Sequence, residues 1–227
     1  MVIERGIAAS THGRYLVVPP ASSDPAPLLV GFHGYAESAD TQIERMRAIP
    51  GSDGWVIVSI QGLHRFYERR RNEVIASWMT RQDREYAIAD NLAYVDAVVD
   101  GVSREWAAAP GIVFAGFSQG VAMAFRSASS STRRVDGVIA VGGDVPPEID
   151  TIALARVGRA LVCRGARDKF YAPETFENDQ RRLRESRVDV TPLAFDGEHE
   201  WSDEVSHAAS LFLRARTGSL KNLTCEA

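Results

Sequence analysis

Residues 112–120 read Ile-Val-Phe-Ala-Gly-Phe-Ser-Gln-Gly, and a stretch of small residues from Val121 to Ala128 follows them. The apolar run predicts a buried strand, and the stretch after Gly120 predicts a helix. Glycines on both sides of Ser118 permit a tight, strained turn, because a Cβ there would crowd the adjoining strand and helix. A strand, tight turn and helix of this kind expose the serine of a G-x-S-x-G motif as a nucleophile.

The same alternation of strand and helix patterns extends along the chain. Apolar runs predict strands at 15–18, 28–32, 56–60, 112–115, 138–141, 160–163 and 190–195, and helix patterns fall at 41–48, 84–106, 122–129, 173–186 and 203–216. Such alternation requires crossover connections, so it predicts an α/β fold: a mostly parallel, twisted sheet of about seven strands with helices on both faces.

Two connections stand out by composition. Pro19-Pro20 and Pro25-Ala26-Pro27 mark a hairpin-like turn between the first two strands. Residues 61–81 are interpreted as a long irregular loop, and long loops inside compact domains often serve as lids or binding loops.

A serine hydroxyl is a weak nucleophile at neutral pH, so Ser118 needs a base further along the chain. The second half of the sequence contains two histidines, His199 and His207. His199 lies in a loop between a strand pattern and a helix pattern, whereas His207 falls within the helix pattern. We therefore predict His199 as the base, in the order serine, acid, histidine.

The acid that orients this histidine is predicted to be Asp168. It follows the apolar run 160–163, and the carboxyl ends of strands are where open α/β sheets place their chemistry. Asp144 also follows a strand pattern and is the alternative acid. For Asp168 itself, the alternative is a turn residue paired with a neighbouring basic side chain.

Acyl transfer also needs two N–H donors for the oxyanion that forms on the carbonyl. The turn at Ser118 supplies one, the N–H of Gln119. The second is predicted at Tyr35, because His33-Gly34 follows the buried strand pattern 28–32 and the glycine lets the backbone turn inward. His33 precedes Ser118 in the chain, so a structural role is expected for it.

Aromatic and apolar residues near these positions are candidates for the substrate pocket. We expect Phe66, Trp78 and Met79 to build an acyl pocket, while Phe170, Tyr171 and Trp201 line the same cleft or pack the loops. Arg69, Arg70 and Arg71 form either a solvated turn or a site for an anionic group of the substrate.

Composition limits the possible classes of protein. The 227 residues are 45% hydrophobic and 25% charged, as in an ordinary globular protein with a sizeable core. We interpret 1–227 as a single domain with its core at about 14–216 and a poorly ordered tail at 217–227. A formal charge of −4 argues against nucleic acid as a partner.

Compartment is inferred from missing signals. No apolar segment approaches the length of a membrane span, and the first residues, Met-Val-Ile-Glu-Arg, do not resemble a signal peptide. The two cysteines, Cys163 in a strand pattern and Cys225 in the tail, do not suggest a disulfide. These features predict a cytoplasmic protein.

Taken together, the motifs resemble those of the phospholipase/carboxylesterase family of α/β-hydrolases, which includes acyl-protein thioesterases. The resemblance covers Leu28 to Phe212 and rests on G-F-S-Q-G at Ser118, G-A-R-D-K-F at Asp168 and G-E-H-E-W at His199. It implies the α/β-hydrolase fold and a serine hydrolase that cleaves carboxylic esters through an acyl-enzyme. Such a hydrolase requires no metal or organic cofactor. Relatives are often dimers, so a homodimer is a further expectation.

The substrate is left open by departures from the family pattern. Trp78 matches a tryptophan of the relatives, but Met-Thr-Arg-Gln follows it where many relatives continue Phe-Asp, and residues 65–71 are unusually basic. A small-molecule ester is the expected substrate. The alternatives are an acyl thioesterase, an amidase or peptidase with the same triad, and a non-catalytic binding module.

Overall fold

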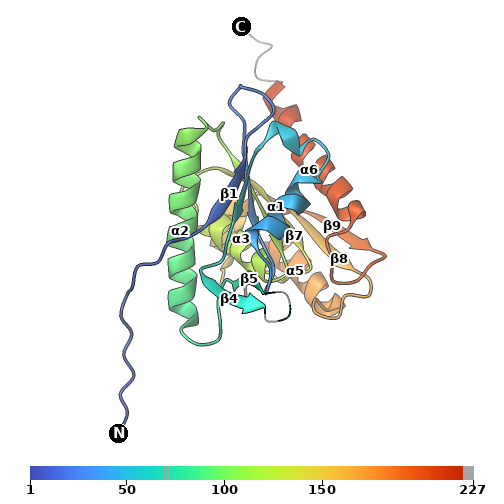
Figure 1. Ribbon diagram of the computed structural model, residues 1–227. Coiled ribbons are helices and arrows are strands. Elements are labelled where there is room, and N and C mark those ends of the chain that lie inside the picture. The colour runs from blue at the N-terminus through green and yellow to red at the C-terminus, as the bar shows by residue number, and fades with distance from the viewer. Residues whose placement is uncertain (69, 71, 222–227) are drawn as a thin grey trace.

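Within residues 1–68, 70 and 72–221, which the computed structural model describes, seven strands form the central sheet in the order β1-β3-β2-β6-β7-β8-β9 (Figure 1). They are β1 (Tyr15–Val18), β2 (Leu28–Phe32), β3 (Val56–Ile60), β6 (Ile112–Phe117), β7 (Val135–Val141), β8 (Arg159–Gly165) and β9 (Asp189–Phe195). Every neighbouring pair is parallel except β1 with β3. The predicted mostly parallel α/β sheet is confirmed.

The first two strands do not form the predicted hairpin. β1 pairs antiparallel with β3, with Tyr15 opposite Ile60, and β3 lies between β1 and β2. Both edges of β2 are already taken by parallel partners, β3 and β6. The proline-rich segment after β1 therefore carries the chain past one strand instead of closing a tight turn.

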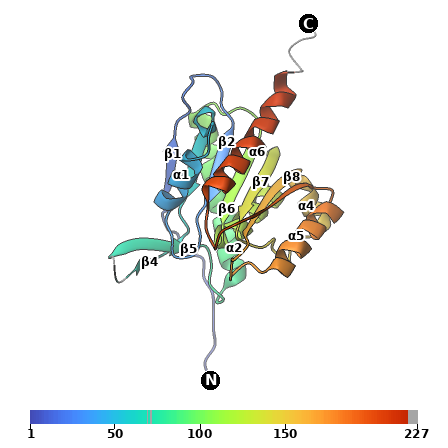
Figure 2. The same ribbon diagram turned by 90° about the vertical axis from the view of Figure 1, so that its right-hand side faces the viewer.

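Helices cover both faces of the sheet. They are α1 (Ala39–Arg47), α2 (Arg84–Glu105), α3 (Gln119–Ser130), α4 (Thr151–Leu154), α5 (Pro173–Glu185) and α6 (Asp203–Lys221), with short 3-10 turns at Ser52–Gly54 and Ala155–Val157. One core contains side chains of α2, α3, α4 and α5, and the other contains those of α1 and α6. Figure 2 views the molecule from the side of α1 and α6.

The central strands are apolar because both of their faces are covered. All five residues of β2 are buried. Leu28, Val30 and Phe32 join one core and Leu29 joins the other, as the two-residue repeat of a strand requires. The near-continuous apolar runs therefore reflect burial on both sides of the sheet.

The stretch 61–81, predicted as an irregular loop, contains a β-hairpin. β4 (His64–Glu68) pairs antiparallel with β5 (Glu73–Ser77), with Phe66 opposite Ile75 and Tyr67 opposite Val74. Aromatic and β-branched side chains pair well across strands, which explains the ladder. The hairpin projects from the main body (Figure 2).

The two ends of the chain differ. The first fourteen residues are exposed and carry no helix or strand, and they run past α2 away from the body (Figure 1). At the other end α6 continues to Lys221, beyond its predicted end at residue 216, so residues 217–221 of the expected tail are helical. Residues 222–227, including Cys225, lie outside the described part.

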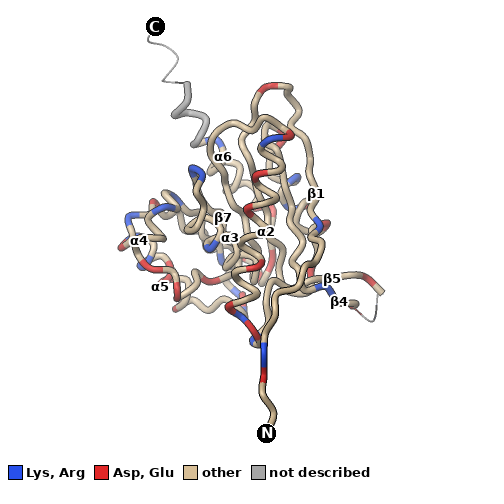
Figure 3. Tube along the Cα trace, turned by 90° about the vertical axis from the view of Figure 1, so that its left-hand side faces the viewer, with Lys and Arg blue, Asp and Glu red and all other residues tan. Residues whose placement is uncertain are grey.

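Charges are mixed over the surface. Figure 3 shows basic and acidic residues interspersed along α2, α4 and α5, in keeping with a small net charge. Among the described helices, none combines the length and the apolar character that crossing a membrane demands.

Candidate active site

Ser118 occupies the turn between β6 and α3 with φ 51° and ψ −119°, a conformation that costs an ordinary residue about 1–3 kcal/mol. Its N–H donates to the Val141 carbonyl of β7 at 2.8 Å. A Cβ on Gly116 would lie 2.4 Å from the Gly120 oxygen, and one on Gly120 would lie 2.1 Å from the Phe32 oxygen. The predicted strained turn is confirmed, and both glycines are required by close backbone contacts.

Asp168 and His199 are joined by a hydrogen bond of 2.8 Å from the imidazole Nδ1 to the carboxylate Oδ2. The other oxygen, Oδ1, accepts the N–H groups of Phe170 at 2.8 Å and Tyr171 at 3.0 Å. The Asp168 side chain is 1% exposed and that of His199 is 19% exposed. Both carboxylate oxygens thus accept hydrogen bonds, and Nε2 of the histidine stays available for a second partner.

A buried arginine holds the loop that carries Asp168. Nε of Arg164 donates to the Tyr171 carbonyl at 2.6 Å, and Nη2 donates to the Asp168 carbonyl at 3.2 Å. The Tyr171 hydroxyl donates to Asp179 of α5 at 2.9 Å. Burial raises the pKa of the Asp179 carboxyl above its usual value.

The histidine lies beside the turn that contains Ser118. The ring of Phe117, the residue just before the serine, is 5.0 Å from the His199 ring. Two glycines after β7 pack closely against these residues. A Cβ on Gly142 would lie 3.2 Å from the His199 imidazole, and one on Gly143 would lie 2.3 Å from the Ser118 carbonyl oxygen. Ser118, Asp168 and His199 therefore follow the carboxyl ends of three parallel strands of one sheet, β6, β8 and β9.

The backbone N–H groups at the predicted oxyanion positions differ from their neighbours in having no acceptor within the described part of the chain. Gly34 donates to the Glu37 side chain at 2.8 Å, and Ala36 donates to the Ala76 carbonyl at 3.0 Å. Among the described residues, no acceptor faces the N–H of Tyr35 or that of Gln119. These are the two donors that the sequence predicts.

His33 has a structural environment. It is fully buried, its Nδ1 donates to the Gly34 carbonyl at 2.7 Å, and its Nε2 accepts the Gly62 N–H at 3.0 Å. Burial lowers the pKa of this imidazole. Both ring nitrogens are occupied within the protein, so His33 fixes the loop instead of reacting.

Trp78 has no exposed surface, so its predicted place in the acyl pocket needs correction. The indole packs edge-on against Phe32, with ring centroids 5.3 Å apart, and its Nε1 donates to the His33 carbonyl at 2.8 Å. Through this hydrogen bond to His33, the indole holds the loop that leads to Tyr35. The amide side chain of Gln119 adds a second anchor, because it accepts the Trp78 N–H at 3.0 Å.

The other predicted pocket residues differ in exposure. Phe170 is 83% exposed and lies 4.9 Å from the His199 ring, and Phe66 lies 5.9 Å from the Tyr35 ring. Met79 is half-buried against one core, and Trp201 is half-buried against the other. Phe170, Phe66 and Tyr35 therefore present exposed aromatic surface, Phe170 beside His199 and Phe66 beside Tyr35.

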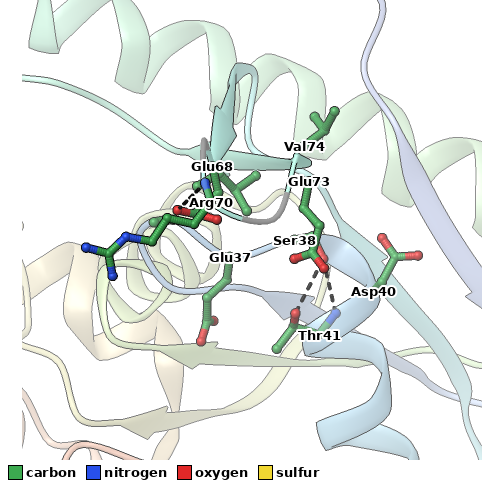
Figure 4. Close-up of a pocket in the computed structure, with 10 residues that line it drawn as sticks. Glu37, Ser38, Asp40, Thr41, Glu68, Arg70, Glu73 and Val74 are labelled. Carbon is green, nitrogen blue, oxygen red and sulfur yellow. Dashed lines mark hydrogen bonds between the residues drawn. The ribbon is translucent and has the colours of Figure 1, made fainter.

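A separate hollow of about 770 Å³ lies between the hairpin and the start of α1. Figure 4 shows Glu37, Glu68, Glu73 and Arg70 around it. No member of the triad lines this hollow. Arg70 donates its backbone N–H to Glu68 at 3.2 Å, and Arg69 and Arg71 lie outside the described residues.

The alternative acid and the alternative base are both exposed side chains. Asp144 is exposed after β7, and His207 is exposed on α6. The imidazole of His199 instead bonds Asp168. Sequence reasoning missed the roles of Gly142, Gly143 and the Glu37–Arg45 ion pair; only the Gly-Gly step after a strand pattern carried a visible signal.

Comparison with known families agrees with this geometry. The family model described as phospholipase/carboxylesterase matches residues 14–215. The chain therefore belongs to the phospholipase/carboxylesterase family of α/β-hydrolases. No curated protein matches the sequence.

Solved structures share the fold at low sequence identity. Esterase PE8 has a TM-score of 0.72 at 18% identity, covering 90% of this chain and 99% of its own. A carboxylesterase from Mesorhizobium loti has a TM-score of 0.73 at 17% identity, covering 89% and 94%. SOBER1 from Arabidopsis thaliana has a TM-score of 0.69 at 16% identity, covering 85% and 99%.

Proposed function

We propose that the chain is a serine hydrolase that cleaves small carboxylic esters, with Ser118 as nucleophile, His199 as base and Asp168 as orienting acid. The observation that carries this proposal is the 2.8 Å hydrogen bond from His199 Nδ1 to Asp168, whose carboxylate is buried and is also held by two backbone N–H groups. That bond leaves Nε2 unprotonated, which is the form a general base needs. Membership of the phospholipase/carboxylesterase family supports the substrate class.

The cycle follows from these positions. His199 Nε2 takes the Ser118 proton while Oγ attacks the ester carbonyl carbon, and the N–H groups of Tyr35 and Gln119 bind the oxyanion. The intermediate collapses as the imidazolium returns the proton to the leaving alcohol. Water then attacks the acyl-serine in the same way and releases the acid. Asp168 stabilises the imidazolium in both halves.

The proposal is tested with a fluorophosphonate probe and p-nitrophenyl esters of graded acyl length. The wild-type protein is expected to be labelled at Ser118 and to hydrolyse the esters. Ser118→Ala should abolish labelling and lower kcat on the order of a millionfold, as removal of the nucleophile does in well-studied triads. A folded wild-type protein that neither turns over nor reacts is the outcome expected of a non-catalytic binding module.

A second candidate, an acyl thioesterase, uses the same machinery because thioester and ester carbonyls react alike with an activated serine. Fluorophosphonate labelling does not separate the two. The comparison is a matched oxygen ester and thioester of one acyl chain. A kcat/KM at least tenfold higher for the thioester, beyond its intrinsic reactivity with hydroxide, would reassign the substrate class.

A further inference from the structure

Arg45 and Glu37 form an ion pair next to the segment that carries Tyr35. Both terminal nitrogens of the Arg45 guanidinium donate to the Glu37 carboxylate, Nη1 to Oε2 at 2.6 Å and Nη2 to Oε1 at 2.7 Å. The two side chains are 18% and 21% exposed. Burial alone would raise the pKa of Glu37, but the hydrogen bonds from Arg45 hold it below its usual value, so the pair is ionised at neutral pH.

The carboxylate of this pair also binds the backbone of the loop. Oε2 of Glu37 also accepts the Gly34 N–H at 2.8 Å. This bond satisfies the N–H of Gly34, the residue before Tyr35, and so fixes the orientation of the peptide group between His33 and Gly34. With Ala36 tied to Ala76, the Tyr35 N–H remains the amide of this turn that has no acceptor in the described structure.

The guanidinium reaches the other half of the site. Cζ of Arg45 lies 4.1 Å from the centroid of the Phe117 ring, which in turn lies 5.0 Å from His199. A stacked cation over an aromatic face is a favourable contact. One side chain on α1 thus contacts both the residue before Ser118 and the carboxylate that fixes the loop of Tyr35.

We propose that Arg45 and Glu37 are positioning residues of the active site, which set the two oxyanion donors, Tyr35 and Gln119, at one fixed separation. Neither side chain touches the reacting atoms. Arg45 has a second effect, because it neutralises a carboxylate close to the place where negative charge develops on the substrate. The inference rests on the proposed hydrolase function and adds to it.

A double-mutant cycle on Arg45 and Glu37 tests this arrangement, because substitutions of residues in one hydrogen-bond network have non-additive effects on activity. Arg45→Met leaves the Glu37 carboxylate unpaired, so we expect kcat to fall on the order of 10- to 100-fold with KM nearly unchanged. Glu37→Gln keeps an oxygen acceptor for Gly34 and should cost less. The double variant should be more active than Arg45→Met alone, because the uncompensated charge is gone.

Arg45→Lys and Arg14→Met complete the set. Lysine retains the charge but not the two-pronged bond and the stacking, so its kcat should be intermediate. Arg14 makes a similar two-bond pair with Asp40 on the same helix but contacts neither Gly34 nor Phe117, so Arg14→Met should keep the wild-type kcat. Rates are normalised to the fraction of sites titrated by the fluorophosphonate, which removes any contribution from unfolded protein.

The outcomes separate the two proposals. An active wild-type enzyme whose Arg45→Met and Arg45→Lys variants keep kcat would overturn the positioning role alone. A double variant no better than Arg45→Met would overturn the neutralising role. A wild-type protein without turnover or labelling would overturn the hydrolase assignment, and the positioning role with it. Should Arg45→Met fail to fold, the positioning role is tested by comparing the kcat of Arg45→Lys and Glu37→Gln with that of Arg14→Met.

Discussion

At the scale of single residues, the site depends on a buried carboxylate whose two oxygens both accept hydrogen bonds from within the protein. Asp168 accepts one hydrogen bond from His199 and two from the backbone, and its side chain is almost fully buried. An isolated buried carboxylate would be costly, so these donors are what make its position tenable. Its geometry therefore allows one tautomer of the histidine.

Asp168→Asn tests this reading. The amide offers an N–H where His199 needs an acceptor, so the imidazole should adopt the wrong tautomer and kcat should fall about 10⁴-fold, as in other triads. Asp144→Asn is the matched control, because Asp144 also follows a strand but is exposed. Steady-state kinetics on one p-nitrophenyl ester measures both. Equal losses for the two variants would contradict the choice of Asp168.

Phe170 gives a second prediction at this scale. Its ring lies tilted beside the His199 ring yet is 83% exposed, so it contributes little to the core. Phe170→Ala should leave the free energy of unfolding within about 0.5 kcal/mol of wild type. It should raise KM for esters with long acyl chains more than for acetate esters. A KM that is unchanged across the series would remove Phe170 from the substrate-binding surface.

At the scale of elements, the turn between β6 and α3 is held by close backbone approach. A Cβ at position 120 would meet the Phe32 carbonyl oxygen at 2.1 Å, and a backbone atom cannot rotate away as a side chain can. The strand, the turn and the helix are thus packed against β2 without spare room. This is why the motif needs glycine at position 120.

Gly120→Ala should lower the free energy of unfolding by about 2–3 kcal/mol, the cost of forcing an extra group into a packed site. Gly101→Ala is the control. Gly101 lies inside α2 with nothing within 4 Å of its added Cβ, so alanine there should stabilise the protein by about 0.5–1 kcal/mol. Urea unfolding followed by circular dichroism gives both values. A neutral Gly120→Ala would mean that the turn can relax.

The hairpin β4–β5 could not be predicted from hydrophobic periodicity. Its strands are short and largely exposed, with β4 reading His-Arg-Phe-Tyr-Glu, so no apolar period distinguishes them from a loop. Cross-strand pairs such as Phe66 with Ile75 stabilise it. Those pairs exist only when the two strands have met.

At the scale of the whole molecule, the two cores share one sheet, so the part from β1 to α6 should unfold as a unit. Side chains of β1 pack against both cores, while the exposed residues before it carry no helix or strand. Removing residues 1–9 should change the free energy of unfolding by less than about 0.5 kcal/mol. Removing residues 1–18 deletes the ladder with β3 and should destabilise the protein strongly.

Tryptophan fluorescence and far-ultraviolet circular dichroism should report coincident urea transitions for the wild type and for the shorter truncation. Two separate transitions would contradict the single domain proposed for the chain. Light scattering on the same samples measures the molar mass and so tests the predicted homodimer.

The amino-acid sequence by itself determined the sheet, the strained turn at Ser118 and the order of serine, aspartate and histidine, because these follow from local periodicity and from the rule that parallel strands end at one edge. Tertiary structure alone decided that His199 bonds Asp168 and not the alternative, Asp144. It also decided that Trp78 is buried against the loop of Tyr35 and that Arg45 contacts both Glu37 and Phe117. These contacts link residues that lie far apart in the chain or on elements whose mutual orientation no local pattern records. Their geometry is set by how the layers pack.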